Sequence, residues 1–200
     1  CQGFDMKLSL MSSFLKIFLM CVAWTSASFA NATELSDLLK RSDHVLLMRH
    51  ALAPGVGDPA GYKLDDCKTQ RNLDSQGRAQ AQKTGQWLKA QGVQDALVFT
   101  SAWCRCKETA DKLGLSVPVQ ETSLNSFFDD MRQGPQSNVR LQKFIAAQLK
   151  SKGDKALILV THHVNIAELM GENVGSGDMV LVKVNSQGQR ISHKVFPSPS

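Results

Sequence analysis

Short, fully apolar runs separated by helical segments are the feature of this sequence that most restricts its fold. Ala156–Val160 reads Ala-Leu-Ile-Leu-Val, and Val45–Met48 and Ala96–Phe99 are similar runs. Four or five consecutive apolar residues are typical of a strand that is buried on both faces. Such strands alternating with helices predict an α/β fold, here a three-layer α/β/α sandwich with a mainly parallel central sheet.

The other elements follow from periodicity and from turn residues. Asp74 and Ser101 are candidate N-caps, each standing before a helical segment. Pro118 makes a short strand near it peripheral. Helices are expected at residues 33–42, 74–91, 102–113, 136–150 and 164–170. The remaining segments are expected to be a terminal hairpin at 179–184 and 189–195, and irregular stretches at 51–68 and 124–135.

The first 30 residues have the layout of a secretory signal peptide. Lys7 and Lys16 supply positive charge, the apolar run Ile17–Trp24 follows, and small residues around Ala30 suit cleavage. The run is too short to span a bilayer as a helix, and a buried helix or a membrane anchor is the alternative interpretation. Residues 1–5, before Met6, are possible extra N-terminal residues. We therefore expect a periplasmic protein without a stable membrane anchor after processing.

Residues 31–200 are expected to form a single domain of modest positive charge. The full chain has 23 basic and 18 acidic side chains, and loss of Lys7, Lys16 and Asp5 leaves 21 and 17. No Lys/Arg-rich block with interleaved aromatic residues is present, which argues against nucleic acid as a partner. The charge suits a small anionic substrate.

Three cysteines follow the predicted signal segment: Cys67, Cys104 and Cys106. An oxidising compartment favours one disulfide. Cys104 and Cys106 are too close in sequence to pair readily, so Cys67 is expected to pair with one of them; three unpaired thiols are the alternative. No second Cys or His stands at ligand spacing, so neither a metal nor another cofactor is expected.

Polar side chains come directly after three of the predicted strands. The pairs are Arg49-His50, Thr100-Ser101 and Thr161-His162. Because ligands in parallel α/β sheets bind beyond the carboxyl ends of the strands, we expect these side chains to meet at one binding edge. Taken singly, each histidine has an ordinary structural alternative, as a helix cap or a core-edge residue.

Two arginines of this edge suit a phosphate group. The planar guanidinium of Arg49 matches phosphate oxygens. Arg105 falls in the first turn of a predicted helix, where unpaired N–H groups and the macrodipole attract anions; an ordinary solvated helix residue is the alternative. His50 can act as a nucleophile when it is neutral.

Together these motifs resemble the histidine phosphatase superfamily, which includes the phosphoglycerate mutases. The resemblance rests on three motifs in chain order: Leu47-Met48-Arg49-His50-Ala51, then Ser101 with Arg105 and Thr109-Ala110, then Thr161-His162. The resemblance covers the whole chain after the signal segment. Within the family, the chain is most similar to a secreted bacterial branch. The family's first motif usually ends in glycine, where this chain has Ala51.

The resemblance implies a metal-independent hydrolase of phosphate monoesters with a phosphohistidine intermediate. His50 attacks phosphorus, and Arg49, Arg105 and His162 hold the phosphoryl oxygens. Neighbouring guanidinium groups are expected to keep His50 neutral, and its second ring nitrogen to donate to a backbone carbonyl. Similarity to envelope-linked heptose phosphatases suggests a small phosphorylated substrate such as a cell-envelope sugar phosphate. A phosphohistidine-protein phosphatase and a catalytically silent phosphate-binding protein are the alternatives.

The general acid is the least defined part of this prediction. Many relatives carry a carboxylic acid between the second and third motifs, where this chain has Asn125, which is a poor proton donor. Asp129 is the candidate acid. The candidate substrate-binding residues are Arg71, Asn72, Ser101, Asn125 and His163; for Arg71 a surface ion pair is the alternative.

Overall fold

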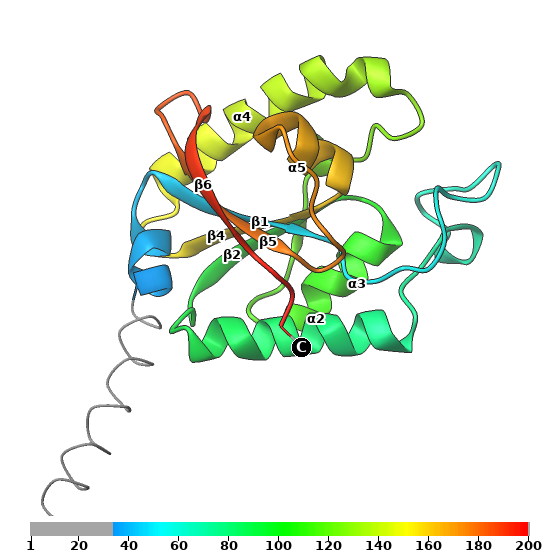
Figure 1. The fold of residues 1–200 in the computed structure, drawn as a ribbon, viewed down its shortest axis with the longest axis horizontal. Helices are drawn as coiled ribbons and strands as arrows, with labels where there is room; N and C mark the ends of the chain where they lie inside the picture. The colour runs from blue at the N-terminus through cyan, green and yellow to red at the C-terminus, as the bar shows by residue number, and fades with distance from the viewer. Residues whose placement is uncertain (1–33, 200) are drawn as a thin grey trace, which may run out of the picture.

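A six-stranded sheet with the order β3-β2-β4-β1-β5-β6 forms the centre of the molecule (Figure 1). The computed structural model describes residues 34–199, so the predicted signal peptide lies outside the described residues. The strands are β1 (His44–Arg49), β2 (Ala96–Thr100), β3 (Val119–Gln120), β4 (Ala156–Thr161), β5 (Met179–Val184) and β6 (Arg190–Phe196). β1 to β4 run parallel, whereas β5 and β6 pair antiparallel. The mainly parallel sheet and the terminal hairpin are therefore confirmed.

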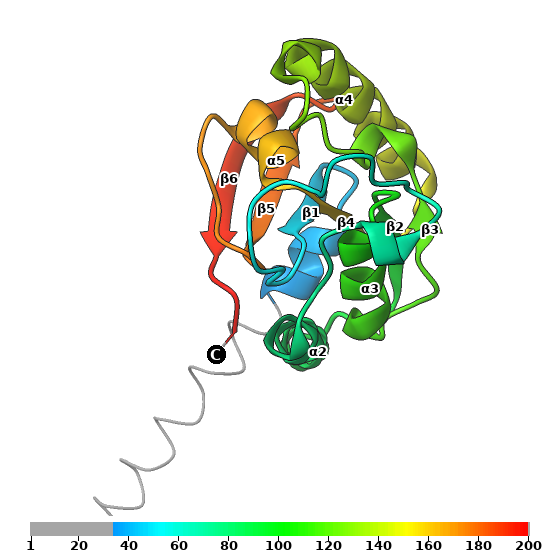
Figure 2. The same ribbon diagram turned by 90° about the vertical axis from the view of Figure 1, so that its right-hand side faces the viewer.

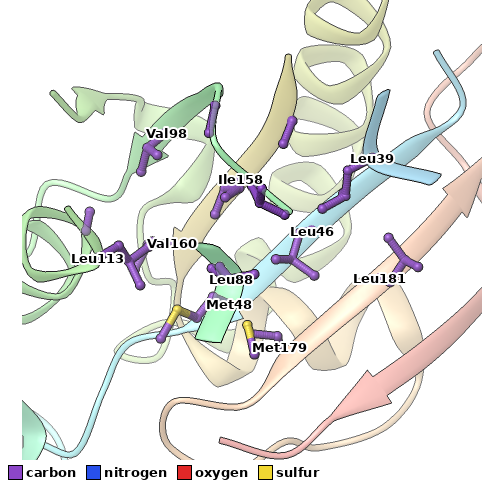
Figure 3. Close-up of a cluster of buried hydrophobic side chains, with 14 of the residues drawn as sticks. Leu39, Leu46, Met48, Leu88, Val98, Leu113, Ile158, Val160, Met179 and Leu181 are labelled. Atoms are coloured by element: carbon purple, nitrogen blue, oxygen red, sulfur yellow. The ribbon is translucent and has the colours of Figure 1, made fainter. Parts of the chain in front are cut away.

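Helices cover both faces of the sheet, which explains why the central strands are apolar throughout. Leu46 and Met48 of β1 pack in one core with residues from segment 34–40, α2 and α3 (Figures 1 and 3). Val45 and Leu47, which alternate with them, pack in a second core with α4 and α5. The helices are α2 (Ser75–Ala90), α3 (Cys104–Leu113), α4 (Gly134–Ser151) and α5 (His163–Met170), with a further helix that includes residues 34–40.

The start of α2 is fixed close to the turn that follows β1. The Asp74 carboxylate accepts a hydrogen bond from Gly77 N at 2.7 Å, so the predicted cap is confirmed. Gly77 itself packs against the backbone, and a Cβ atom there would lie 2.0 Å from Leu52 O. Glycine at this position lets the helix approach the segment just beyond His50.

The start of α3 differs from the prediction. The helix begins at Cys104, and its N-cap residue, Trp103, makes no side-chain capping bond. Ser101 is therefore not the cap, because its hydroxyl is directed to His162 instead. α4 begins at Gly134, two residues earlier than predicted, with proline in its first turn, where proline is well tolerated.

The long segment after β1 crosses the edge at which the parallel strands end (Figures 1 and 2). It ends in a short 3-10 helix, Cys67–Thr69. The stretch 124–135, predicted to be irregular, contains a second such helix, Met131–Gln133, and a third, Thr122–Leu124, ends at its first residue. Across residues 34–199, none of the helices combines the length and the apolar character needed to cross a membrane.

Candidate active site

Two histidines meet where β1 and β4 end. His50 N donates to Thr161 O at 2.9 Å, so the residue after β1 continues the pairing with β4. This brings the rings of His50 and His162 into an edge-on arrangement, with centroids 5.5 Å apart. Both side chains are buried. The parallel register of the two strands thus assembles the pair that the sequence predicted.

His50 is held as a neutral imidazole with a free Nε2. Its Nδ1 lies 2.7 Å from Ala51 O, and since a carbonyl can only accept, Nδ1 carries the proton. Burial is the main cause that lowers the pKa of His50 to about 3, and the charges of Arg105 and Arg49 lower it further, against the opposing effect of the Ala51 hydrogen bond. The predicted neutral state therefore has burial as its first cause, ahead of the neighbouring arginines.

His162 is also fixed in one tautomer, by a chain of polar contacts beneath the site. Its Nδ1 lies 3.5 Å from Nη2 of Arg105, and a guanidinium can only donate, so the proton belongs on Nε2. Nε2 lies 2.8 Å from Ser101 Oγ, and Ser101 donates in turn to Asn125 Oδ1 at 3.4 Å. Burial, followed by the charges around it, lowers the pKa of His162 well below its ordinary range.

Arg49 and Arg105 each present a buried N–H donor that has no partner within residues 34–199. Arg49 Nη1 donates to Val174 O at 2.8 Å, but in this part of the chain its Nε makes no hydrogen bond, and neither does the Nε of Arg105. A buried donor without a partner lowers the stability of the folded protein, so such groups commonly indicate a ligand-binding site. Two of them beside a neutral His50 suit an anion with several acceptor oxygens, such as phosphate.

A cavity of about 200 Å³ opens at this strand edge. Seven predicted site residues line it: Arg49, His50, Arg71, Arg105, Asp129, His162 and His163. Apolar side chains stand at its rim, where Val56 and Phe128 are exposed. A cavity of this volume is large enough for a phosphoryl group.

Three predicted substrate-binding residues do not line the cavity. Asn72 donates to Cys67 O and to another backbone carbonyl, so its amide closes the turn before α2. Asn125 Oδ1 accepts from the backbone N–H of Ala102 at 2.9 Å and from Ser101. Asn125 and Ser101 therefore support His162 from below, which the sequence pattern did not indicate.

Arg71 lies in the cavity wall, not in a surface ion pair. Its Nε donates to Gly57 O at 2.8 Å and its Nη1 to Ala53 O, so it holds the segment after β1 in place. Burial, followed by the charge of Arg105, lowers the pKa of Arg71. The long segment is thereby tied to the same wall as the predicted phosphate ligands.

Asp129 lies at the open side of the cavity and contacts a residue that the sequence reasoning missed. Its Oδ2 accepts from the hydroxyl of Tyr62 at 2.8 Å. Burial and the hydrogen bond to Asp129 raise the pKa of Tyr62 to about 12. Asp129 thus reaches the cavity with one oxygen already bonded, in a position compatible with the predicted proton donor.

Asp58 is a second residue that sequence reasoning missed. Its carboxylate is 5% exposed and forms an ion pair with Arg105, the shorter N–O distance being 2.9 Å. The sequence signal is an acidic residue within Gly55-Val56-Gly57-Asp58-Pro59, inside a long segment that directly follows His50. Thr109 was predicted only as part of a motif. Its hydroxyl accepts from Ala51 N and donates to Arg105 O, so it links the segment after β1 to α3.

One disulfide joins Cys67 and Cys104. The sequence predicted that Cys67 pairs with Cys104 or Cys106, and the structure shows Cys104 as the partner. It ties the end of the long segment to the residue before Arg105. Cys106 is buried as a free thiol, and burial raises its pKa to about 12. Among residues 34–199, no three His, Cys, Asp or Glu side chains cluster closely enough to hold a metal ion.

Comparisons with known proteins agree with this geometry. A family model of the histidine phosphatase superfamily (branch 1) matches residues 45–132. The protein histidine phosphatase SixA, solved with tungstate, is similar with a TM-score of 0.51 and 21% identity, covering 76% of this chain and 94% of that chain. A mycobacterial glucosyl-3-phosphoglycerate phosphatase, solved with VO3, has a TM-score of 0.58 and 18% identity, covering 79% and 100%.

A phosphoserine phosphatase from Entamoeba histolytica, solved with 3-phosphoglyceric acid, has a TM-score of 0.53 and 12% identity, covering 78% of this chain and 96% of that one. At these identities the likeness to solved structures is one of fold. No curated protein matches the chain.

Proposed function

We propose that this chain, whose residues 45–132 match the family model of the histidine phosphatase superfamily (branch 1), belongs to that superfamily and hydrolyses phosphate monoesters through a phosphohistidine at His50. The observation that carries the proposal is a neutral, buried His50 beside two guanidinium groups whose Nε atoms lack partners in the described part of the chain. A neutral imidazole is a nucleophile. Unpaired buried N–H donors can hydrogen-bond to the phosphoryl oxygens and stabilise their negative charge.

The first step forms a bond between His50 Nε2 and phosphorus while the bond from phosphorus to the ester oxygen breaks. The hydrogen bond from Nδ1 to Ala51 O stabilises the positive charge that develops on the ring. Arg49 and Arg105 offset the charge on the equatorial oxygens. In the second step, water attacks phosphorus while the bond from phosphorus to Nε2 breaks. The Asp129 carboxylate takes up the proton that water loses, phosphate leaves, and neutral His50 and the protonated acid are restored.

The leaving oxygen of an alkyl ester needs a proton, which we assign to Asp129. It is the carboxylate at the open side of the cavity, where an ester group extends. Asn125 supports a second candidate, a phosphohistidine-protein phosphatase, since the residue where many relatives carry an acid is here an amide bonded to Ala102 N. An imidazole leaves more readily than an alkoxide and needs less help from an acid.

Export to the periplasm remains a proposal and is supported by chemistry. The disulfide between Cys67 and Cys104 suits an oxidising compartment. A phosphorylated sugar of the cell envelope is our proposed substrate there, without a metal. Intact-mass measurement of periplasmic protein tests export: we expect a chain that begins near Asn31, and one that retains Ile17–Trp24 would refute processing.

The mechanism is tested with an aryl phosphate and with His50→Ala. Wild type should release phosphate and, when quenched during turnover, carry acid-labile phosphate that maps to His50. His50→Ala should lose both signals while keeping the wild-type circular dichroism spectrum. His193→Ala, which removes a partly exposed histidine of β6 that contacts Glu172, is the matched control and should keep both. Turnover by His50→Ala at the wild-type rate would refute the assignment.

A further inference from the structure

The carboxylate of Asp58 is surrounded by hydrogen-bond donors inside the cavity wall. Oδ1 accepts from Arg105 Nη1 at 2.9 Å and from Arg71 N at 2.9 Å. Oδ2 accepts from the same Nη1 at 3.0 Å and from Trp103 Nε1 at 3.0 Å. Both oxygens are thus engaged by groups that can only donate, which leaves no acceptor for a carboxyl proton. Asp58 is consequently an anchor for its neighbours and not a second general acid.

Asp58 occupies one side of the Arg105 guanidinium and leaves the other free. Asp58 bonds only Nη1. Among the residues that the structure describes, Nε has no partner and Nη2 has only the 3.5 Å contact with His162. Nε and Nη2 form the lateral edge of the guanidinium, from which two parallel N–H bonds reach two oxygens of one phosphate. A phosphate on the Nε–Nη2 edge would therefore not compete with Asp58 for the same N–H group.

We propose that Asp58 is a positioning residue that turns the Nε–Nη2 edge of Arg105 toward the substrate phosphate. The inference rests on the phosphate site of the proposed function and adds a residue that the family motifs do not include. Asp58 also holds the Trp103 indole, which packs edge-on against His162 with centroids 5.2 Å apart. One carboxylate thus fixes two side chains that border His162.

The position of Asp58 is itself fixed from both sides. The preceding carbonyl, Gly57 O, accepts from Arg71 Nε at 2.8 Å, and Gly57 has a φ of 67°, in the region that favours glycine. The segment is tied again at the disulfide between Cys67 and Cys104. A carboxylate held this firmly can restrict a long arginine side chain, which otherwise samples many rotamers.

The test is direct binding of inorganic phosphate, measured by calorimetry, to wild type and to two Asp58 variants. Asp58→Asn removes the charge with little change of shape, and Asp58→Glu keeps the charge but moves the carboxylate. Positioning predicts that both weaken phosphate binding by at least ~10-fold, the usual scale for a misplaced charge-assisted bond. Asp65→Asn removes an equal charge from an exposed position in the same segment and should bind as wild type does.

A competing role gives the opposite sign. Asp58 could instead only neutralise the charge of Arg105, or occupy the position that phosphate takes. In either case Asp58→Asn would bind phosphate as tightly as wild type or more tightly, and this result would overturn the proposal. Unchanged binding by Asp58→Glu would overturn it equally. Thermal unfolding is recorded for each variant, and Asp58→Glu carries the test should the Asn variant not fold.

A double-mutant cycle separates positioning from a general loss of structure. If Asp58 acts through Arg105, then Asp58→Asn should have little further effect on phosphate affinity in the Arg105→Ala background. Full additivity of the two losses would contradict the proposal. Aryl phosphate kinetics should show the loss mainly in kcat/KM. Wild type that binds phosphate but does not turn over aryl phosphate would refute the proposed function and still leave the binding test of Asp58 intact.

Discussion

The neutral state of His50 predicts a specific loss of stability in acid, which can be measured without any substrate. The pKa of His50 is about 3 in the folded protein, against 6.5 for an ordinary histidine. Because the unfolded chain takes up the proton first as the pH falls, the contribution of neutral His50 to stability is fully present above pH 6.5. It is lost progressively between pH 6.5 and about 3.

The size of the effect follows from these two pKa values. Between pH 7.5 and pH 5.0, His50 should lower the free energy of unfolding by about 2 kcal/mol, at 1.36 kcal/mol per pH unit below the unfolded pKa. His50→Gln lacks this titration, since its amide is neutral at both pH values. The fall in stability from pH 7.5 to 5.0 should therefore be smaller in the variant by about 2 kcal/mol.

Urea unfolding in buffers free of phosphate measures both proteins at both pH values. Equal m-values serve as the control, because they indicate that the variant exposes the same surface on unfolding. The difference between the two pH dependences isolates His50, while other acid-sensitive groups such as His162 are present in both chains. An identical pH dependence would mean that His50 is protonated normally in the folded protein, which would refute its proposed role as a neutral nucleophile.

Three further predictions concern other parts of the molecule. Asp129→Asn should reduce kcat for an alkyl phosphate at least ~10-fold more than for an aryl phosphate, because only the poor leaving group needs a proton; equal losses would remove it from the acid role. Replacing Cys67 and Cys104 by serine should lower the unfolding free energy by about 3–4 kcal/mol, as expected for a loop of this length, with sequence separation 37. A urea midpoint that reductant does not shift in wild type would contradict this. Gly77→Ala should cost roughly 1–3 kcal/mol, since its Cβ would meet Leu52 O; an unchanged Tm would argue against that close approach.

The sequence by itself determined the layers of the fold and the residues of the site that follow the ends of the parallel strands. Apolar runs such as Ala156–Val160 reveal strands buried on both faces, because burial leaves a periodic pattern along the chain. Parallel strands end at one edge, so Arg49-His50 and Thr161-His162 were expected to meet, and their backbones do join there. These features depend on local pattern and on the direction of the strands, and a single sequence carries both.

Only the tertiary structure decided the contacts made by irregular segments. Asp58 lies in a segment rich in glycine, where no periodicity fixes the direction of a side chain, and its partner Arg105 is 47 residues away. The same holds for Asn72, which bonds backbone carbonyls and faces away from the cavity. A serine such as Ser101 can either cap a helix N-terminus or bond a nearby side chain. Because β4 pairs beside β2, His162 lies close to Ser101, and the serine hydroxyl contacts the histidine. Polar side chains satisfy whichever donors and acceptors the folded chain brings within about 3 Å, and that neighbourhood is set by long-range packing.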